Sequence, residues 1–141
     1  MKKVLFSLVI IIAGLLIAGF IWVQSNREEL HNAYVKGQSI GAERGAQMCM
    51  DWTLEKSKHC SSINISCMAE SQLVLSGCLQ SAEDSAVVCM PVPSSEESDA
   101  TGWVANICQM QANGSESCPQ LMSKFLMECD KVRNLEQAGI Q

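Results

Sequence analysis

Residues 49–78 decide the fold, and their sequence is CMDWTLEKSKHCSSINISCMAESQLVLSGC. Its four cysteines lie symmetrically about the centre of the segment, and each outer cysteine is eleven residues from its inner neighbour. Eleven residues are about three turns of an α-helix, so the two cysteines of each half share one helix face. A chain folded at the polar segment 61–66 would form an antiparallel helical hairpin. The spacing therefore predicts the disulfides Cys49–Cys78 and Cys60–Cys67.

Paired cysteines at near-constant spacing on two antiparallel helices are similar to the coiled-coil-helix-coiled-coil-helix proteins, which carry twin CX9C motifs. This chain departs from that pattern, because each of its pairs encloses ten residues and a further cysteine, Cys89, follows the second pair. We read the likeness as a shared physical solution within residues 49–78. No family function is carried over from it.

All eight cysteines follow residue 48, their number is even, and no two are closer than seven residues. Structural zinc sites usually pair ligands two to four residues apart, so the spacing favours a disulfide framework in an oxidising compartment. Cys108 and Cys118 lie symmetrically about the turn signal at Asn113, which favours a Cys108–Cys118 bond and leaves Cys89–Cys129. The main alternative pairs Cys89 with Cys118 and Cys108 with Cys129.

Residues 4–23 are an apolar run without charge, close to the roughly twenty residues that span a hydrocarbon core. We predict an uncleaved transmembrane signal anchor, with residues 1–3 in the cytoplasm because Lys2 and Lys3 precede the run. Residues 24–30 would form a polar neck and residues 31–141 an extracytoplasmic domain. A cleaved signal peptide is the alternative, but its apolar core is usually shorter and ends in a small-residue cleavage site.

A stripe of small residues recurs every fourth position before the first cysteine: Ala33, Gly37, Gly41 and Gly45. Glycine costs about 1 kcal/mol relative to alanine inside a helix, so the stripe requires a compensating close contact. The antiparallel hairpin would place Gly45 opposite Ala82 and Gly41 opposite Ala86. We expect intramolecular helix packing, and a docking groove for another protein's helix is the functional alternative.

The periodicity predicts an all-α domain of about four helices, arranged as two antiparallel helical hairpins. The first hairpin pairs residues 31–58 with residues 67–90, and Pro91 and Pro93 end its second helix. Residues 102–111 and 118–137 form the second hairpin around the Asn113-Gly114 turn.

Charge and composition exclude several classes of function. Two of the ten basic residues are Lys2 and Lys3, so from Gln24 onward eight basic side chains stand against fifteen acidic ones, a formal charge of −7. Nucleic acid is therefore not an expected partner. No catalytic arrangement is evident, because the chain has only two histidines, His31 and His59, and no C-x-x-C pair. We expect no enzyme activity, no resident cofactor and no metal site.

Two hypotheses follow for function. The preferred one is a single-pass accessory or assembly subunit, tethered in the lipid bilayer by residues 4–23, whose disulfide-stapled domain contacts a larger membrane or periplasmic protein complex. The short Met-Lys-Lys start favours a bacterial inner membrane, whereas a eukaryotic chain would be extracellular or lumenal. The alternative is extracytoplasmic handling of copper or zinc, because methionines accompany most cysteines and thioether and thiolate ligands suit Cu(I).

Overall fold

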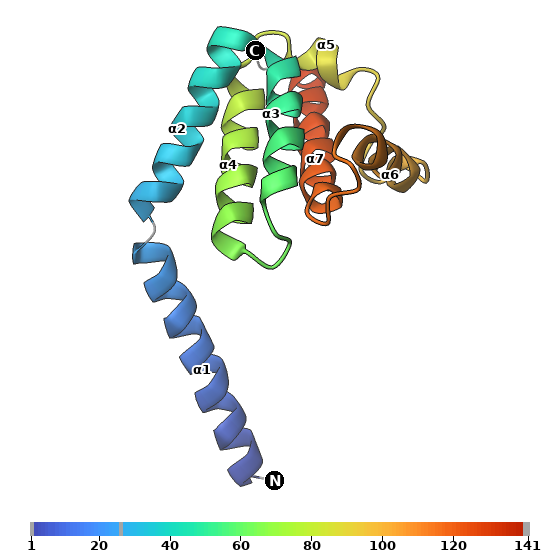
Figure 1. Cartoon of the computed structure of the whole chain (residues 1–141). Coiled ribbons are helices and arrows are strands. Elements are labelled where there is room, and N and C mark those ends of the chain that lie inside the picture. Colours follow the sequence, from blue (N-terminus) through green and yellow to red (C-terminus); the bar gives the residue numbers. More distant parts are fainter. Residues whose placement is uncertain (1, 26, 140–141) are drawn as a thin grey trace.

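The computed structural model describes the backbone of residues 2–25 and 27–139, and the side chains of residues 12–21, 24–25 and 27–139. The described residues are all-α, as the sequence predicts, but the N-terminal helix is followed by six helices rather than about four (Figure 1). The helices are α1 (Lys2–Ser25), α2 (Arg27–Arg44), α3 (Ala46–His59), α4 (Ile65–Ser81), α5 (Ser85–Cys89), α6 (Ala100–Gln111) and α7 (Cys118–Gln137). Residues 1, 26 and 140–141, which belong to the predicted start, neck and domain, lie outside the described residues.

The prediction of a membrane-spanning helix over residues 4–23 is corrected by the structure. Those residues belong to α1, but within the described part of the chain no helix is both long enough and apolar enough to cross a membrane.

The predicted helix over residues 31–58 is broken at Gly45, where the chain reverses between α2 and α3. Gly45 has φ of 79°, in the left-handed region that favours glycine. The backbone N–H of Ala46, at the start of α3, donates to Asp84 Oδ1 at 2.7 Å. A carboxylate thirty-eight residues away in sequence therefore caps α3 at the reversal.

The glycine stripe is buried, as intramolecular packing requires, but its partners differ from those predicted. A Cβ at Gly37 would overlap the carbonyl of Val74, and one at Gly41 would overlap the carbonyl of Cys78. Residue numbers therefore increase together along both helices, so α2 packs parallel to α4, beside it in Figure 1. The predicted facing of Gly41 with Ala86 is wrong, because α2 runs parallel to α4 and Gly41 lies against Cys78 and Ser81. A Cβ at Gly45 would lie closest to the carboxylate of Asp84, and the facing of Gly45 with Ala82 stays a prediction.

The predicted helix over residues 67–90 is also divided, into α4 and α5. The hydroxyl of Ser85 donates to the carbonyl oxygens of Leu79 and Ala82, the latter at 2.7 Å, so it satisfies acceptors where α4 ends. Helix α7 has the bounds that the sequence predicts, and α6 begins two residues earlier than predicted. Asn113 and Gly114 both have positive φ, 52° and 70°, at the turn before α7.

Four disulfides join the helices: Cys49–Cys78, Cys60–Cys67, Cys89–Cys129 and Cys108–Cys118. These are the pairs that the sequence spacing favours, and all eight cysteines are bonded. Two bonds close long segments, with sequence separations of 29 and 40 residues, and two close short ones, with separations of 7 and 10. Chain entropy alone predicts a stabilisation of about 3.5–4 kcal/mol for each long segment and about 2.5–3 kcal/mol for each short one.

We expect Gly41→Ala to lower the free energy of unfolding by about 1–3 kcal/mol, because its methyl group must push α2 away from the backbone of α4. Gly102→Ala is the matched control. Gly102 lies in α6 with open space around it, so alanine should raise stability by about 0.5–1 kcal/mol. Denaturant unfolding of both variants checks the prediction, and an equal effect of the two substitutions would contradict the packing described.

Candidate functional site

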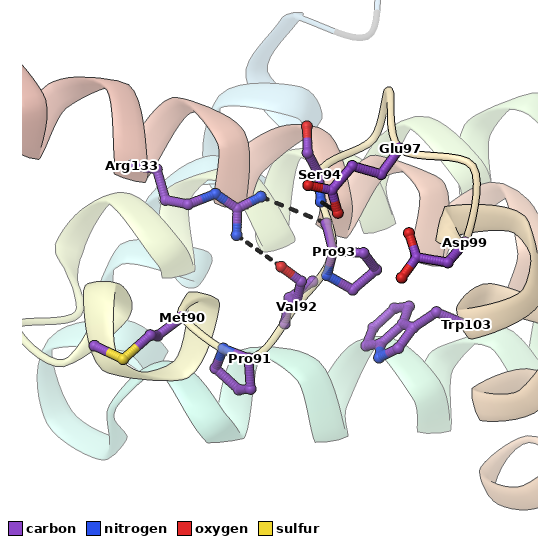
Figure 2. A pocket seen from close by; sticks show the side chains of 9 residues that line it. All are labelled: Met90, Pro91, Val92, Pro93, Ser94, Glu97, Asp99, Trp103 and Arg133. Atoms are coloured by element: carbon purple, nitrogen blue, oxygen red, sulfur yellow. Dashed lines mark hydrogen bonds between the residues drawn. The ribbon is translucent and has the colours of Figure 1, made fainter.

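A hollow of about 460 Å³ lies between α5, α6 and α7, where the segment after α5 crosses the surface (Figure 2). Pro91 and Pro93 follow α5 and keep this segment from continuing as a helix. Glu97 and Asp99 stand at one side, and the indole of Trp103 lies beside Asp99 in the view. Trp103 stacks on Phe125 of the core, with ring centroids 6.3 Å apart, so its orientation is set by packing.

Arg133 of α7 holds the segment in place from the other side of the hollow. Its guanidinium donates to the carbonyl oxygens of Cys89 at 2.7 Å and Val92 at 2.9 Å, and contacts Pro93 O at 3.4 Å. The same guanidinium donates to Asp130 at 2.6 Å, so its charge is balanced within α7. Three carbonyl groups at the end of α5 thus obtain a charged donor that the helix does not provide.

Asp130 ties the segment at a second point. Its carboxylate accepts the Ser95 N–H at 2.9 Å and the Ser95 hydroxyl at 2.6 Å. Burial by itself raises the pKa of Asp130, but the hydrogen bonds from Ser95 and Arg133 outweigh burial and lower the pKa to about 2. Asp130 therefore remains ionised over the whole physiological range.

A buried carboxylate, Glu128, faces the opposite side of α7. Only 1% of the residue is exposed, yet its side chain accepts from Lys124 at 2.6 Å, Lys131 at 2.9 Å and Ser76 at 2.9 Å. Burial raises the pKa of Glu128, and these three hydrogen bonds together lower it below the usual value. The group is a paired structural charge that joins α7 to α4.

The charged groups described above support the fold. Within the described residues, no buried side-chain nitrogen or oxygen lacks a hydrogen-bond partner.

Among the described residues, the longest run of exposed large apolar side chains lies on α1, which extends away from the bundle in Figure 1. Its described side chains lie on every side of the helix, and the large apolar ones are 49–70% exposed. They are Ile12, Leu15, Leu16, Ile17, Phe20 and Ile21. A second exposed pair, Ile63 and Ile65, lies at the tip of the α3–α4 hairpin, with 87% and 71% exposure. Contiguous exposed apolar surface of this kind commonly marks an interaction site.

The sequence-predicted residues are distributed as follows. Ala33, Gly37 and Gly41 face α4, so the stripe that could have formed an external docking groove is occupied by the chain's own helix. Ala82 is buried beside the break after α4, whereas Ala86 lies in α5 and is half-buried. The stripe therefore positions α2 and offers no free groove.

The groups expected for metal handling are dispersed. All eight cysteines are disulfide-bonded and supply no thiolate, and Met90, Met110 and Met127 are exposed on different helices or ends. His59 lies on the exposed face of α3 beside Glu55. Among the residues that the structure describes, no three histidine, cysteine or acidic side chains form a group that could hold a metal ion.

Sequence reasoning missed the supporting charges Asp84, Glu128, Asp130 and Arg133. The local signals are the spacings of Asp130 with Arg133 and of Glu128 with Lys124 and Lys131, three or four residues apart on one helix, a common arrangement for an ion pair. Each of the four groups also has a partner 35 to 52 residues away in sequence. A pattern confined to one helix could not reveal those partners.

Comparison with known proteins found no relative of this chain. No protein-family model matches it, and no similar curated protein or solved structure was found.

We expect Asp130→Asn to lower the free energy of unfolding by about 1–2 kcal/mol at pH 6, because the amide removes a charged acceptor from Ser95 and Arg133. The folded pKa is about 2, below the roughly 3.9 of an unfolded Asp, so this contribution is present above pH 4. It should be lost as the pH falls from 4 to 2, and the two proteins should then converge.

Urea unfolding of both proteins at several pH values measures this effect. Asp51→Asn is the control, because Asp51 is exposed on α3 and should change stability at pH 6 by less than about 0.5 kcal/mol. A stability difference between wild type and Asp130→Asn that stays constant down to pH 2 would contradict the assigned pKa.

Proposed function

We propose that this protein is a non-enzymatic accessory or assembly subunit that works outside the cytoplasm and presents α1 to a partner protein. The single observation that carries the proposal is the exposure of the described apolar side chains of α1 beside a bundle stapled by four disulfides. The bonded cysteines indicate an oxidising compartment, where such frameworks persist. The bundle provides a stable base, and α1 provides the surface to be covered.

The exposed face of α1 has the chemistry of a helix-in-groove contact. Leucine, isoleucine and phenylalanine side chains such as Leu16 and Phe20 can fill an apolar groove, and Gly14 and Ala18 are four residues apart on one side. A Cβ at Gly14 would meet nothing within 4 Å, so a partner's helix can approach the backbone closely there. Removing these side chains from water would be the main driving force for association.

The charge of the rest of the chain specifies the partner further. Residues from Gln24 onward carry a formal charge of −7, so a partner surface that surrounds α1 and reaches the bundle should be basic. We therefore propose that α1 binds a different protein, which has an apolar helix-lined groove bordered by Lys and Arg residues. A second copy of this acidic chain would bring like charges together.

Support for a non-enzymatic role comes from the side chains that usually perform covalent catalysis. The cysteines are in disulfides, and His59 hydrogen-bonds Glu55 on an exposed helix face. Neither group is arranged as an activated nucleophile or its base.

The test places a photo-activated cross-linking amino acid at Leu16, which is 70% exposed, in the full chain produced in its own cells. The matched control position is Val87 on α5, which is apolar and 67% exposed but lies in the bundle. We expect one discrete cross-linked product from position 16, identified by mass spectrometry as a different protein, and no such product from position 87. A product with twice the mass of this chain, a lipid adduct alone, or no product would overturn the proposal.

A second variant separates binding from folding. Leu16→Asp should abolish co-purification of the cross-linked partner, because it places a charge in the apolar contact, and should leave the melting temperature of the bundle unchanged. Val87→Asp should leave the partner bound. Salt should weaken the association without abolishing it, because only the basic border of the groove is screened.

A further inference from the structure

We propose that Cys60–Cys67 is a thiol–disulfide exchange site, which accepts two electrons from a dithiol while the other three disulfides keep the bundle folded. The proposal does not depend on the partner of α1, because it concerns the opposite termini of α3 and α4 at the hairpin tip. Its class of substrate is a protein or small molecule with two neighbouring thiols.

Access distinguishes this bond from the others. The six cysteines of the remaining disulfides are at most 4% exposed, whereas Cys60 is 6% exposed and Cys67 is half-buried. The connecting residues 61–66 are all exposed. A hollow of about 500 Å³ also opens beside Cys60, and its lining includes Lys58, His59, Ser115 and Glu116. The half-buried Cys67 and the hollow beside Cys60 thus give this disulfide more contact with solvent than the other three disulfides have.

The bond can also open without loss of the fold. Cys49–Cys78 joins the same two helices three turns deeper in the bundle, so α3 and α4 remain linked when the tip opens. Cys60 packs with Met68 and Leu121 in a small cluster separate from the main core. Opening the tip disturbs this cluster and leaves the main core intact.

The position of Cys67 makes it the better leaving group. It is the third residue of α4, a helix of 17 residues, and its N–H donates to Asn64 Oδ1 at 3.1 Å. A thiolate in the first turn of a helix is stabilised by the helix dipole and by the N–H groups there. Lower basicity of the leaving thiol accelerates exchange.

The reaction balances as follows. One thiolate of the dithiol attacks Cys60 Sγ through the adjacent hollow and forms a mixed disulfide, and the Cys60–Cys67 bond breaks with its electron pair on Cys67 Sγ. The second thiol of the dithiol then loses its proton, and the resulting thiolate attacks the dithiol's other sulfur, which is bonded to Cys60. This step closes a disulfide within the dithiol and releases Cys60 as a thiolate. The dithiol is oxidised to a disulfide, and the protein gains two electrons and binds two protons as its thiolates are protonated.

The test exposes the full, folded chain to limiting dithiothreitol, stops the reaction by acidification and alkylation, and maps the labelled cysteines. We expect Cys60 and Cys67 to be labelled at least about tenfold faster than any other cysteine, with unchanged helical circular dichroism. Earlier labelling of another pair, or labelling of all eight together with loss of helicity, would overturn the proposal.

Two further measurements test the leaving group and the independence of the tip. With glutathione as a single-thiol probe, the mixed disulfide should form on Cys60, and an adduct on Cys67 would overturn its assignment as the leaving group. The double variant Cys60→Ser with Cys67→Ser should fold, retain three disulfides and resist the same dithiothreitol treatment. Failure of this variant to fold would show that the tip bond is part of the essential framework and would overturn the proposal.

Discussion

The structure depends on the close approach of α2 and α4. The chain reversal at Gly45 brings α3 against the same pair of helices. Cys78 on α4 is held from two directions, because Gly41 of α2 lies against its carbonyl and Cys49 of α3 is bonded to its sulfur. The two contacts could not both exist if α2 and α3 were one straight helix. The positive φ of Gly45 and the carboxylate of Asp84 make the reversal possible at the point where α4 ends.

Charged side chains add to the stabilisation that packing and disulfides provide. Glu128 links α7 to α4 through Ser76, and Arg133 with Asp130 fixes the segment that connects α5 to α6. Each of these groups is paired, so each adds stability without leaving a reactive centre. The hollow in Figure 2 is consequently bordered by a structural network.

The bundle is thus cross-linked at its centre, while runs of exposed apolar residues lie on α1 and at the hairpin tip. A scaffold subunit requires this division, since a rigid base limits the entropy lost when a partner is bound. The tip disulfide differs from the other three in exposure and in the short segment that it closes. Exchange there would change the tip while the shared core of α2, α3 and α4 persists.

The sequence by itself determined the helical class, the bounds of α7, and the oxidising compartment that eight paired cysteines indicate. Its favoured pairs are also the four disulfides of the structure. The eleven-residue spacing predicts Cys49–Cys78 and Cys60–Cys67, because about three turns return each cysteine to the same helix face. Symmetry about the turn at Asn113 predicts Cys108–Cys118 and leaves Cys89–Cys129. These properties are local and follow from helical periodicity.

Only the tertiary structure decided where the helices break and which way α2 runs. A glycine every fourth residue predicts close packing but does not state the direction of the partner helix, and Gly45 alone does not distinguish a packing contact from a reversal. The deciding interaction is Asp84 with the N–H of Ala46, thirty-eight residues apart. The supporting bonds of Glu128 and Arg133 are equally distant in sequence, so their role depends on contacts that helical periodicity does not encode.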